Sequence, residues 1–321
     1  MNKLGVLGTA ALLFACHGSS SPSPTGDGGS PPPPTGWRAA VGAGGTLVQT
    51  FDEHTWSMRS SLGVDLFAVT CVGNLKGWAV GQGGAVMHTE DGGQTWAPEQ
   101  SNLVAALRGV HFSDALHGVI AGDGGALART EDGGQSWTPI ATTSSDLGAV
   151  AATTSGEFFV ASAGGSVLHS TDFGRSFSPV AIAGAADVVA IASDADGTLV
   201  FAGDGVGHVF ASTDGAASFH LETTAPAAIA SIASAGQWGG SGWGGVSALA
   251  VGDGGVVLLR ASDGVWAASN AGTTANLRAA LVTDTYSYVA GEGGTLLALE
   301  GNVWTPITTN TTQALYGLDD L

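Results

Sequence analysis

Short apolar segments alternate with glycine-rich turns along almost the whole chain. Segments such as "LRGVHF" (107–112) and "HGVIAG" (117–122) have the length of a β-strand, and helical 3.6-residue periodicity is absent. A turn of the form Gly-x-Gly-Gly recurs roughly every 40 residues. Its copies begin at Gly42, Gly81, Gly122, Ser162, Gly203, Gly252 and Gly291, with "GDGVG" as a variant at the fifth. The pattern predicts seven repeats of four short strands each.

Repeats of this length and strand number are typical of a β-propeller, in which four-stranded blades surround a central axis. We therefore predict an all-β protein with one seven-bladed β-propeller over residues 37–321. The first repeat, from Trp37, lacks the apolar strand that should precede its turn. The chain ends with a matching strand, Leu315–Leu318, that no repeat follows. We predict that this C-terminal strand completes the first blade and closes the ring.

One phrase appears twice between the third and fourth predicted strands, as "TEDGGQTW" (Thr89–Trp96) and "TEDGGQSW" (Thr130–Trp137). It resembles the Asp-box (BNR) repeat, and "STDFGRSF" and "STDGAASF" are further copies. The residues that fit the repeat are Asp91, Gly93, Trp96, Asp132, Gly134, Trp137, Asp172, Phe177, Asp214 and Phe219. The resemblance implies that these turns are structural.

The residue types in this phrase favour the same interpretation. The aspartate can accept N–H groups within its own turn, the glycine can adopt a positive φ, and the aromatic ring can pack between neighbouring sheets. Calcium binding is the functional alternative, but the alternating oxygen ligands and distal glutamate of an EF-hand loop are missing. We predict no metal site and no other cofactor.

The amino end has the pattern of an export signal. Residues 1–15 carry one lysine and a short apolar run, and "LFAC" (Leu13–Cys16), which spans their end, resembles the lipobox of bacterial lipoproteins. That resemblance implies cleavage before Cys16 and lipidation of its thiol; an ordinary signal peptide with an incidental cysteine is the alternative. Residues 16–36 are rich in Pro, Ser and Gly and predict a disordered tether. We expect a cell-envelope protein, periplasmic or at the outer membrane or cell surface.

The charge of the chain limits its partners. Nine Lys and Arg stand against 27 Asp and Glu, so the formal net charge is −18. Binding to a phosphate backbone needs a basic surface, which this composition does not provide. We therefore expect no nucleic-acid partner. Nothing in the sequence argues for an oligomer, and we expect a monomer.

Two regions are candidate binding sites. The variable position of the Gly-x-Gly-Gly turns is acidic in four copies: Asp123, Asp204, Asp253 and Glu292. On one face of a propeller these side chains could form an electronegative ring, although aspartate also simply suits turns. On the other face, the glycine-rich insertion "AGQWGGSGWGG" carries Trp238 and Trp243. These indoles could stack on a sugar or anchor a protein, or they could fold back as a plug.

The repeats also limit the activity. Their residue pattern most resembles that of the photosystem II stability/assembly factor family, as in "AVGQGGAVMHTEDGGQTW". The positively charged face of that family is not evident in this sequence. The Arg-Ile-Pro motif and the arginine pattern expected of a sialidase are absent. A two-carboxylate glycosidase is the alternative, with Asp65, Asp146 and Asp187 as candidate acids. We expect instead a non-enzymatic, membrane-tethered propeller that binds a protein or glycan partner at the cell envelope.

Overall fold

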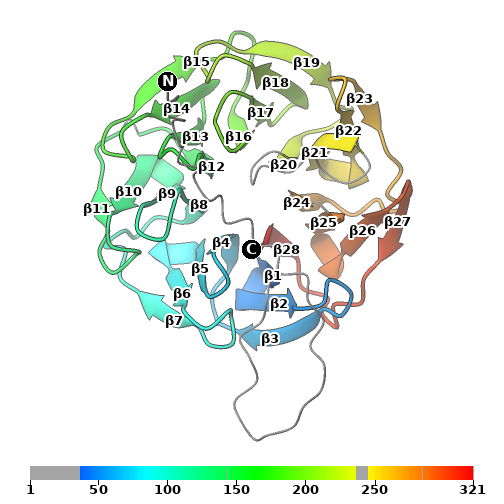
Figure 1. The fold of residues 1–321 in the computed structure, drawn as a ribbon, viewed down its shortest axis with the longest axis horizontal. Coiled ribbons are helices and arrows are strands. Elements are labelled where there is room, and N and C mark those ends of the chain that lie inside the picture. The colour runs from blue at the N-terminus through cyan, green and yellow to red at the C-terminus, as the bar shows by residue number, and fades with distance from the viewer. Residues whose placement is uncertain (1–36, 143, 236–244, 284, 321) are drawn as a thin grey trace, which may run out of the picture.

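The computed structural model describes residues 37–142, 144–235, 245–283 and 285–320. Within this part of the chain, seven four-stranded antiparallel sheets stand around a common axis (Figure 1). The prediction of an all-β, seven-bladed β-propeller is confirmed. The predicted leader and tether, residues 1–36, lie outside the described residues.

Each blade contains four strands that follow one another from the axis outward. Blade 1 consists of β28 (Leu315–Asp320), β1 (Arg38–Gly42), β2 (Thr46–Thr50) and β3 (Ser57–Ser61). Blade 2 consists of β4 (Leu66–Val72), β5 (Lys76–Gly81), β6 (Val86–Thr89) and β7 (Ala97–Glu99). Blade 3 consists of β8 (Leu107–Phe112), β9 (Gly118–Gly122), β10 (Ala126–Thr130) and β11 (Thr138–Pro139). Blade 4 consists of β12 (Leu147–Ala152), β13 (Phe158–Ser162), β14 (Ser166–Ser170) and β15 (Ser178–Ala181). Blade 5 consists of β16 (Val188–Ser193), β17 (Val200–Asp204), β18 (His208–Ser212) and β19 (His220–Thr224). Blade 6 consists of β20 (Ile229–Ser234), β21 (Val246–Gly252), β22 (Val257–Ala261) and β23 (Trp266–Ala268). Blade 7 consists of β24 (Leu277–Val282), β25 (Ser287–Gly291), β26 (Leu296–Glu300) and β27 (Val303–Pro306).

The two ends of the described chain meet in blade 1. Strand β28 pairs with β1 in an antiparallel register that sets Arg38 opposite Asp320 and Val41 opposite Gly317. The predicted closure of the ring by the C-terminal strand is therefore confirmed. It gives the inner edge of β1 a hydrogen-bonding partner, so blade 1 has four strands like the other six blades.

The Gly-x-Gly-Gly turns join the second and third strands of each blade. Five of them form single 3-10 turns: η1 (Ala43–Gly45), η2 (Gln82–Gly84), η3 (Asp123–Gly125), η5 (Asp253–Gly255) and η6 (Glu292–Gly294). In η3, Gly124 and Gly125 have φ of 65° and 78°, a region that favours glycine. The preceding Gly122 is extended, but a Cβ there would lie 2.1 Å from the carbonyl oxygen of Ala106. The glycines thus let the turn lie directly against the start of the inner strand.

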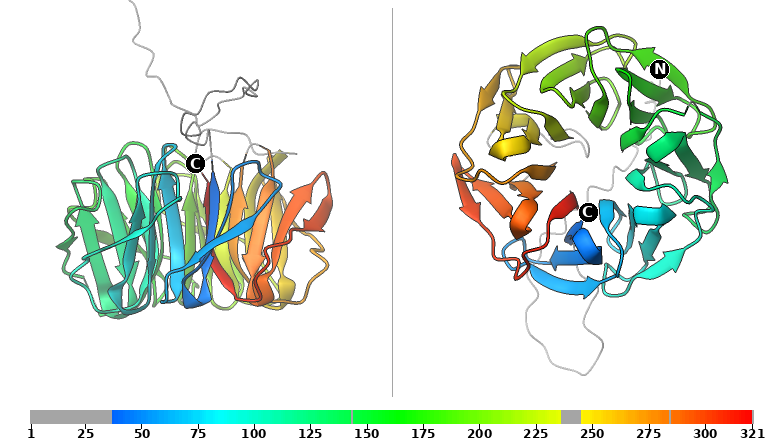
Figure 2. Two further views of the ribbon diagram at one scale, coloured as in Figure 1. Left: turned by 90° about the horizontal axis from the view of Figure 1, so that it is seen from below. Right: turned by 180° about the vertical axis from the view of Figure 1, so that it is seen from behind.

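The propeller has two distinct faces, seen edge-on in the left view of Figure 2. We call the side that carries the turns between second and third strands the GxGG face. Each inner strand begins at this face, because its first residue pairs with the end of the second strand, as in Leu107 opposite Gly122. We call the opposite side the Asp-turn face, because it carries the turns at Asp52, Asp91, Asp132, Asp172 and Asp214.

The apolar core lies between adjacent blades and forms seven clusters, one at each interface. Between blades 2 and 3, the ring of Trp78 stacks on Phe112 with centroids 3.7 Å apart, and Trp137 meets Phe112 edge-on. Trp37 and Tyr288 are among the largest fully buried side chains at other interfaces. Aromatic packing of this kind fixes each blade against the next.

Candidate functional site

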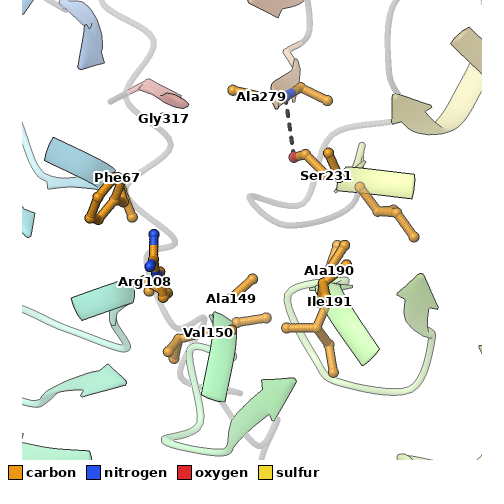
Figure 3. A pocket seen from close by; sticks show the side chains of 18 of the residues that line it. Phe67, Arg108, Ala149, Val150, Ala190, Ile191, Ser231, Ala279 and Gly317 are labelled. Carbon is orange, nitrogen blue, oxygen red and sulfur yellow. Dashed lines mark hydrogen bonds between the residues drawn. The ribbon is translucent and has the colours of Figure 1, made fainter. Parts of the chain in front are cut away.

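The inner strands of all seven blades line a central cavity of about 690 Å³, shown from close by in Figure 3. Most of its wall is small or branched and apolar, with Val150, Ile191 and Ala279 as typical members. Arg108 and Ser231 are polar members drawn in Figure 3, and the Oγ of Ser231 accepts the N–H of Ala280 at 3.3 Å. A cavity of this size falls in the range of known ligand-binding pockets.

One row of side chains gives the mouth of the cavity at the GxGG face its character. It consists of the second residue of each inner strand, and all seven members line the cavity: Phe67, Arg108, Gly148, Val189, Ala230, Arg278 and Tyr316. The large members fall on the adjacent blades 7, 1, 2 and 3, whereas blades 4 to 6 contribute only Gly148, Val189 and Ala230. The mouth is therefore narrowed on one half and open on the other.

Aromatic and cationic groups contact one another in the narrowed half. The guanidinium of Arg108 lies over the ring of Phe67 at 4.3 Å from its centroid. The ring of Tyr316 lies 5.8 Å from that of Phe67. Arg108 also donates Nε–H and Nη2–H to the two carboxylate oxygens of Asp123, at 2.9 Å each. These hydrogen bonds raise the pKa of Arg108 and lower the pKa of Asp123.

The second arginine is held by two acids from neighbouring turns. Arg278 donates Nη1–H to Asp253 at 2.7 Å and Nη2–H to Glu292 at 2.9 Å. Partial burial works against the charged guanidinium, but the two carboxylates prevail and raise the pKa of Arg278. A hydrogen bond from Asn276, together with Arg278, lowers the pKa of Glu292.

The acidic turn residues do not form the four-membered ring that the sequence suggested. Asp123, Asp253 and Glu292 do flank the mouth, each paired with an arginine. Asp204 has a fully buried side chain instead, and it accepts the N–H groups of Ala186, Val206 and His208. Burial alone raises the pKa of Asp204, but these hydrogen bonds prevail and lower it. The carboxylate of Asp204 therefore stabilises its own turn and does not line the mouth.

The three candidate catalytic acids each bridge two blades. Asp65, Asp146 and Asp187 precede the inner strands of their blades and accept the N–H of Gly44, Gly124 and Gly164, respectively, in the turn of the preceding blade. The distances are 2.7 to 2.8 Å. Asn276 occupies the equivalent position before β24 and accepts the N–H of Gly254 at 2.8 Å. This inter-blade hydrogen bond thus needs an acceptor oxygen but no negative charge. A catalytic role for the three acids stays a prediction.

The Asp turns share one hydrogen-bond pattern, which blade 4 illustrates. The Oγ of Ser170 donates to Asp172 and accepts the N–H of Gly174, and Asp172 accepts both the N–H and the O–H of Ser176. Burial opposes the charged form, but these bonds prevail and lower the pKa of Asp172 to about 2. Asp91, Asp132 and Asp214 make the same contacts in their own turns.

In these turns the glycines adopt positive φ, and the aromatic side chains pack between neighbouring blades. Gly93 and Gly134 have φ of 75° and 88°. Trp137 is buried, and Trp96, Phe177 and Phe219 are half-buried against clusters between blades. In the turns of Asp91 and Asp132, both carboxylate oxygens accept donors of the turn itself.

Other candidate residues lie outside the described part of the chain: Trp238 and Trp243 of the insertion, and Cys16 of the lipobox. Within the described ranges, no group of three or more His, Cys, Asp or Glu side chains could hold a metal ion. No helix in those ranges has the length and apolar character needed to cross a membrane.

Sequence reasoning missed the four large residues of the mouth. The sequence shows Phe67 and Tyr316 only as members of strands, and Arg108 and Arg278 only as scattered arginines. An alignment of the seven repeats would have placed all four at the second position of the inner strand. Their pairing with turn acids could not be seen from the sequence, because it depends on residues 14 to 25 positions away.

Comparisons with known proteins bear on the fold. No family model matches the sequence, and no curated protein matches it. The structure is similar to a propeller described as YCF48 bound to D1 peptide, with a TM-score of 0.59 and 19% identity over 76% of this chain and 80% of that one. It is also similar to YCF48 from Cyanidioschyzon merolae, with a TM-score of 0.61 and 16% identity over 78% of this chain and 87% of the other.

A chain in a Nidogen/Laminin complex matches with a TM-score of 0.56 and 11% identity, over 77% of this chain and 97% of its own length. Identities this low report architecture and not activity. The protein is a seven-bladed β-propeller whose structural neighbours include the YCF48 propellers.

Proposed function

We propose that this protein is a non-enzymatic propeller that binds a protein partner at the cell envelope, where a lipid on Cys16 tethers it to a membrane. The observation that carries the proposal is the mouth of the central cavity. There, aromatic and arginine side chains are fixed on inner strands around an apolar pocket. Rigid aromatic and arginine anchors in a pocket are typical of protein-binding hot spots.

The structural neighbours support this choice of partner. One of the YCF48 propellers was solved with a peptide, and the third similar chain belongs to a Nidogen/Laminin complex. A propeller exposes rigid loops on both faces, so the same scaffold can present a binding surface without any catalytic group. The proposal carries only the general role of protein binding over to this chain.

Capture from envelope extract tests this role. The domain of residues 37–321, immobilised through its C-terminus, should retain a protein that excess untagged domain displaces. The purified partner should then bind the domain with a measurable Kd in a calorimeter. If no protein is displaced by the untagged domain, or if the purified candidate does not bind, the proposal fails.

The competing function, hydrolysis of a glycan, can be tested with the same domain. A glycosidase predicts turnover of some member of a glycan panel and loss of that turnover in Asp65→Asn, Asp146→Asn or Asp187→Asn. These substitutions are structurally conservative, because Asn276 already makes the equivalent inter-blade bond. Turnover that one of them abolishes would overturn the non-enzymatic assignment.

The tether is tested separately in the full-length chain expressed in bacteria. Wild-type protein should incorporate a labelled fatty acid and sediment with membranes, and Cys16→Ser should do neither. Equal labelling of the two forms, or no labelling of the wild type, would favour the ordinary signal peptide.

A further inference from the structure

The mouth of the central cavity departs from the seven-fold symmetry of the fold in an ordered way. The seven residues of its row are equivalent by repeat, yet Arg278, Tyr316, Phe67 and Arg108 follow one another around the ring. In the opposite half, the largest member of the row is Val189, which is 37% exposed to solvent. The result is an open apolar hollow bounded on one side by two aromatic rings.

The two arginines in the mouth do not make it a site for anions. Arg108 already uses two N–H groups on Asp123, and Arg278 bridges Asp253 and Glu292. Asp65, Asp146 and Asp187 stand at the same face, and each engages its neighbouring turn through one carboxylate oxygen. Six carboxylates and two guanidinium groups therefore stand at this face, which leaves an excess of four negative charges among them. Such a rim attracts cationic groups and repels anionic ones.

The aromatic rings supply the second half of the recognition. Phe67 and Tyr316 are half-buried, so part of each ring faces the cavity. Deeper in the channel, Val110, Val150 and Ile191 continue the apolar wall. An apolar side chain that enters from the GxGG face can pack on these groups, while flanking ammonium or guanidinium groups stay at the acidic rim.

We infer that the mouth of the cavity binds a basic segment of a partner protein that inserts one aromatic side chain between Phe67, Tyr316 and the small residues of blades 4 to 6. The inference rests on the proposed function and names its site and its ligand class. The acids select for charge, the aromatic pair and the open half select for shape, and the arginines hold the acids in place.

Peptide binding tests the selectivity directly. The probe is a dye-labelled peptide with one phenylalanine flanked by lysines, titrated with the 37–321 domain at low ionic strength and followed by fluorescence anisotropy. Two matched peptides replace the lysines by glutamate or the phenylalanine by alanine. We expect the basic aromatic peptide to bind at least about tenfold more tightly than either, and its affinity to fall as salt is added. Equal or tighter binding of the acidic peptide overturns the inference, as does no binding of the basic one up to about 1 mM.

Substitutions locate the binding in the mouth. The double variant Phe67→Ala with Tyr316→Ala should weaken binding of the basic peptide about tenfold or more. Ala230→Arg, which fills the open half and adds a cation, should weaken it too, whereas Val303→Arg on the Asp-turn face should not. Asp146→Asn should weaken binding a few-fold, roughly what one lost charge at a rim is worth, and Asp263→Asn on the Asp-turn face is its control.

The variants also separate this inference from the proposed function. Circular dichroism and melting curves confirm that each variant is folded before it is titrated. If the double variant and Ala230→Arg bind the peptide like the wild type, the cavity mouth is not the site. Should these folded variants still capture the envelope partner, protein binding stands and only its assignment to the mouth is wrong.

Discussion

Asp204 and Asp253 occupy the same position in the turns of adjacent blades, yet their carboxylates have opposite surroundings. The side chain of Asp204 is fully buried and accepts three backbone N–H groups as well as a bond with the ring of His208. Asp253 is half-buried, with 45% of its side chain exposed, and contacts Arg278. Around Asp204 the turn reads "GDGVG" instead of Gly-x-Gly-Gly, and the acid compensates for the altered backbone.

The two residues should therefore differ in their contribution to stability. Asp204→Ala leaves three partly buried N–H donors without their acceptor, and we expect it to lower the free energy of unfolding by about 2 to 5 kcal/mol. Asp253→Ala breaks a partly exposed ion pair and leaves Arg278 its bond to Glu292, so it should cost less than about 1 kcal/mol. Urea unfolding followed by tryptophan fluorescence measures both. Similar losses for the two variants would contradict the structural assignment of Asp204.

The Asp turns predict a pH dependence of stability. The pKa of Asp172 falls from 3.8 to about 2 in the folded protein. A carboxyl whose pKa is lowered by folding stabilises the protein above its unfolded pKa, and this contribution is lost as the pH falls through the folded value. The wild type should therefore exceed Asp172→Asn in melting temperature at neutral pH, and the difference should shrink between about pH 4 and pH 2. A difference that stays constant over that range would show that the charge of Asp172 is not what stabilises the turn.

At the scale of the elements, the strands were predictable because apolar runs of strand length and glycine turns repeat in every blade. Two features were not. The aromatic contacts between blades, such as Trp78 on Phe112, join residues that no repeat pattern pairs. The mouth of the cavity depends on which member of each inner strand faces the axis, and a bulge after the first residue of most inner strands sets this. A one-residue bulge moves every later side chain to the opposite face of the strand. Because both faces of these strands are apolar, the sequence does not show where the bulge lies.

Substitution of Trp78 measures how much the packing between blades contributes to the free energy of unfolding. Its ring is fully buried between blades 2 and 3, and we expect Trp78→Ala to destabilise the domain by about 3 to 5 kcal/mol. Trp96, which is only half-buried, serves as the comparison, and Trp96→Ala should cost less. Guanidinium titrations report both values. A larger loss for Trp96→Ala would mean that the Asp-turn aromatics, and not the second strands, hold the blades together.

For the whole molecule, stability depends on joining the first blade to the last strand. Leu315 is fully buried and Leu318 nearly so, and both belong to the cluster between blades 7 and 1. Sequence predicted this closure because a solitary strand motif at one end matched a missing strand at the other. It could not predict the ligand, since seven equivalent blades offer many surfaces and the repeat itself specifies none.

Removal of residues 315–321 should abolish cooperative folding. Loss of two buried leucines and of the β1–β28 pairing costs more than about 5 kcal/mol, which is comparable to the whole stability of a typical domain. A permuted domain that carries residues 315–321 ahead of Trp37, joined by a short turn, should recover a cooperative melting transition in differential scanning calorimetry. If the truncated domain melts like the wild type, the ring is not held by its terminal strand.

The pairing of Arg38 with Asp320 also fixes where the chain enters the propeller. Strand β1 starts at the Asp-turn face and runs toward Gly42 on the GxGG face, so whatever precedes Trp37 joins the ring on the Asp-turn face. A protein moored by its amino end would therefore be attached through that side, with its acidic, aromatic opening on the face opposite the point of attachment.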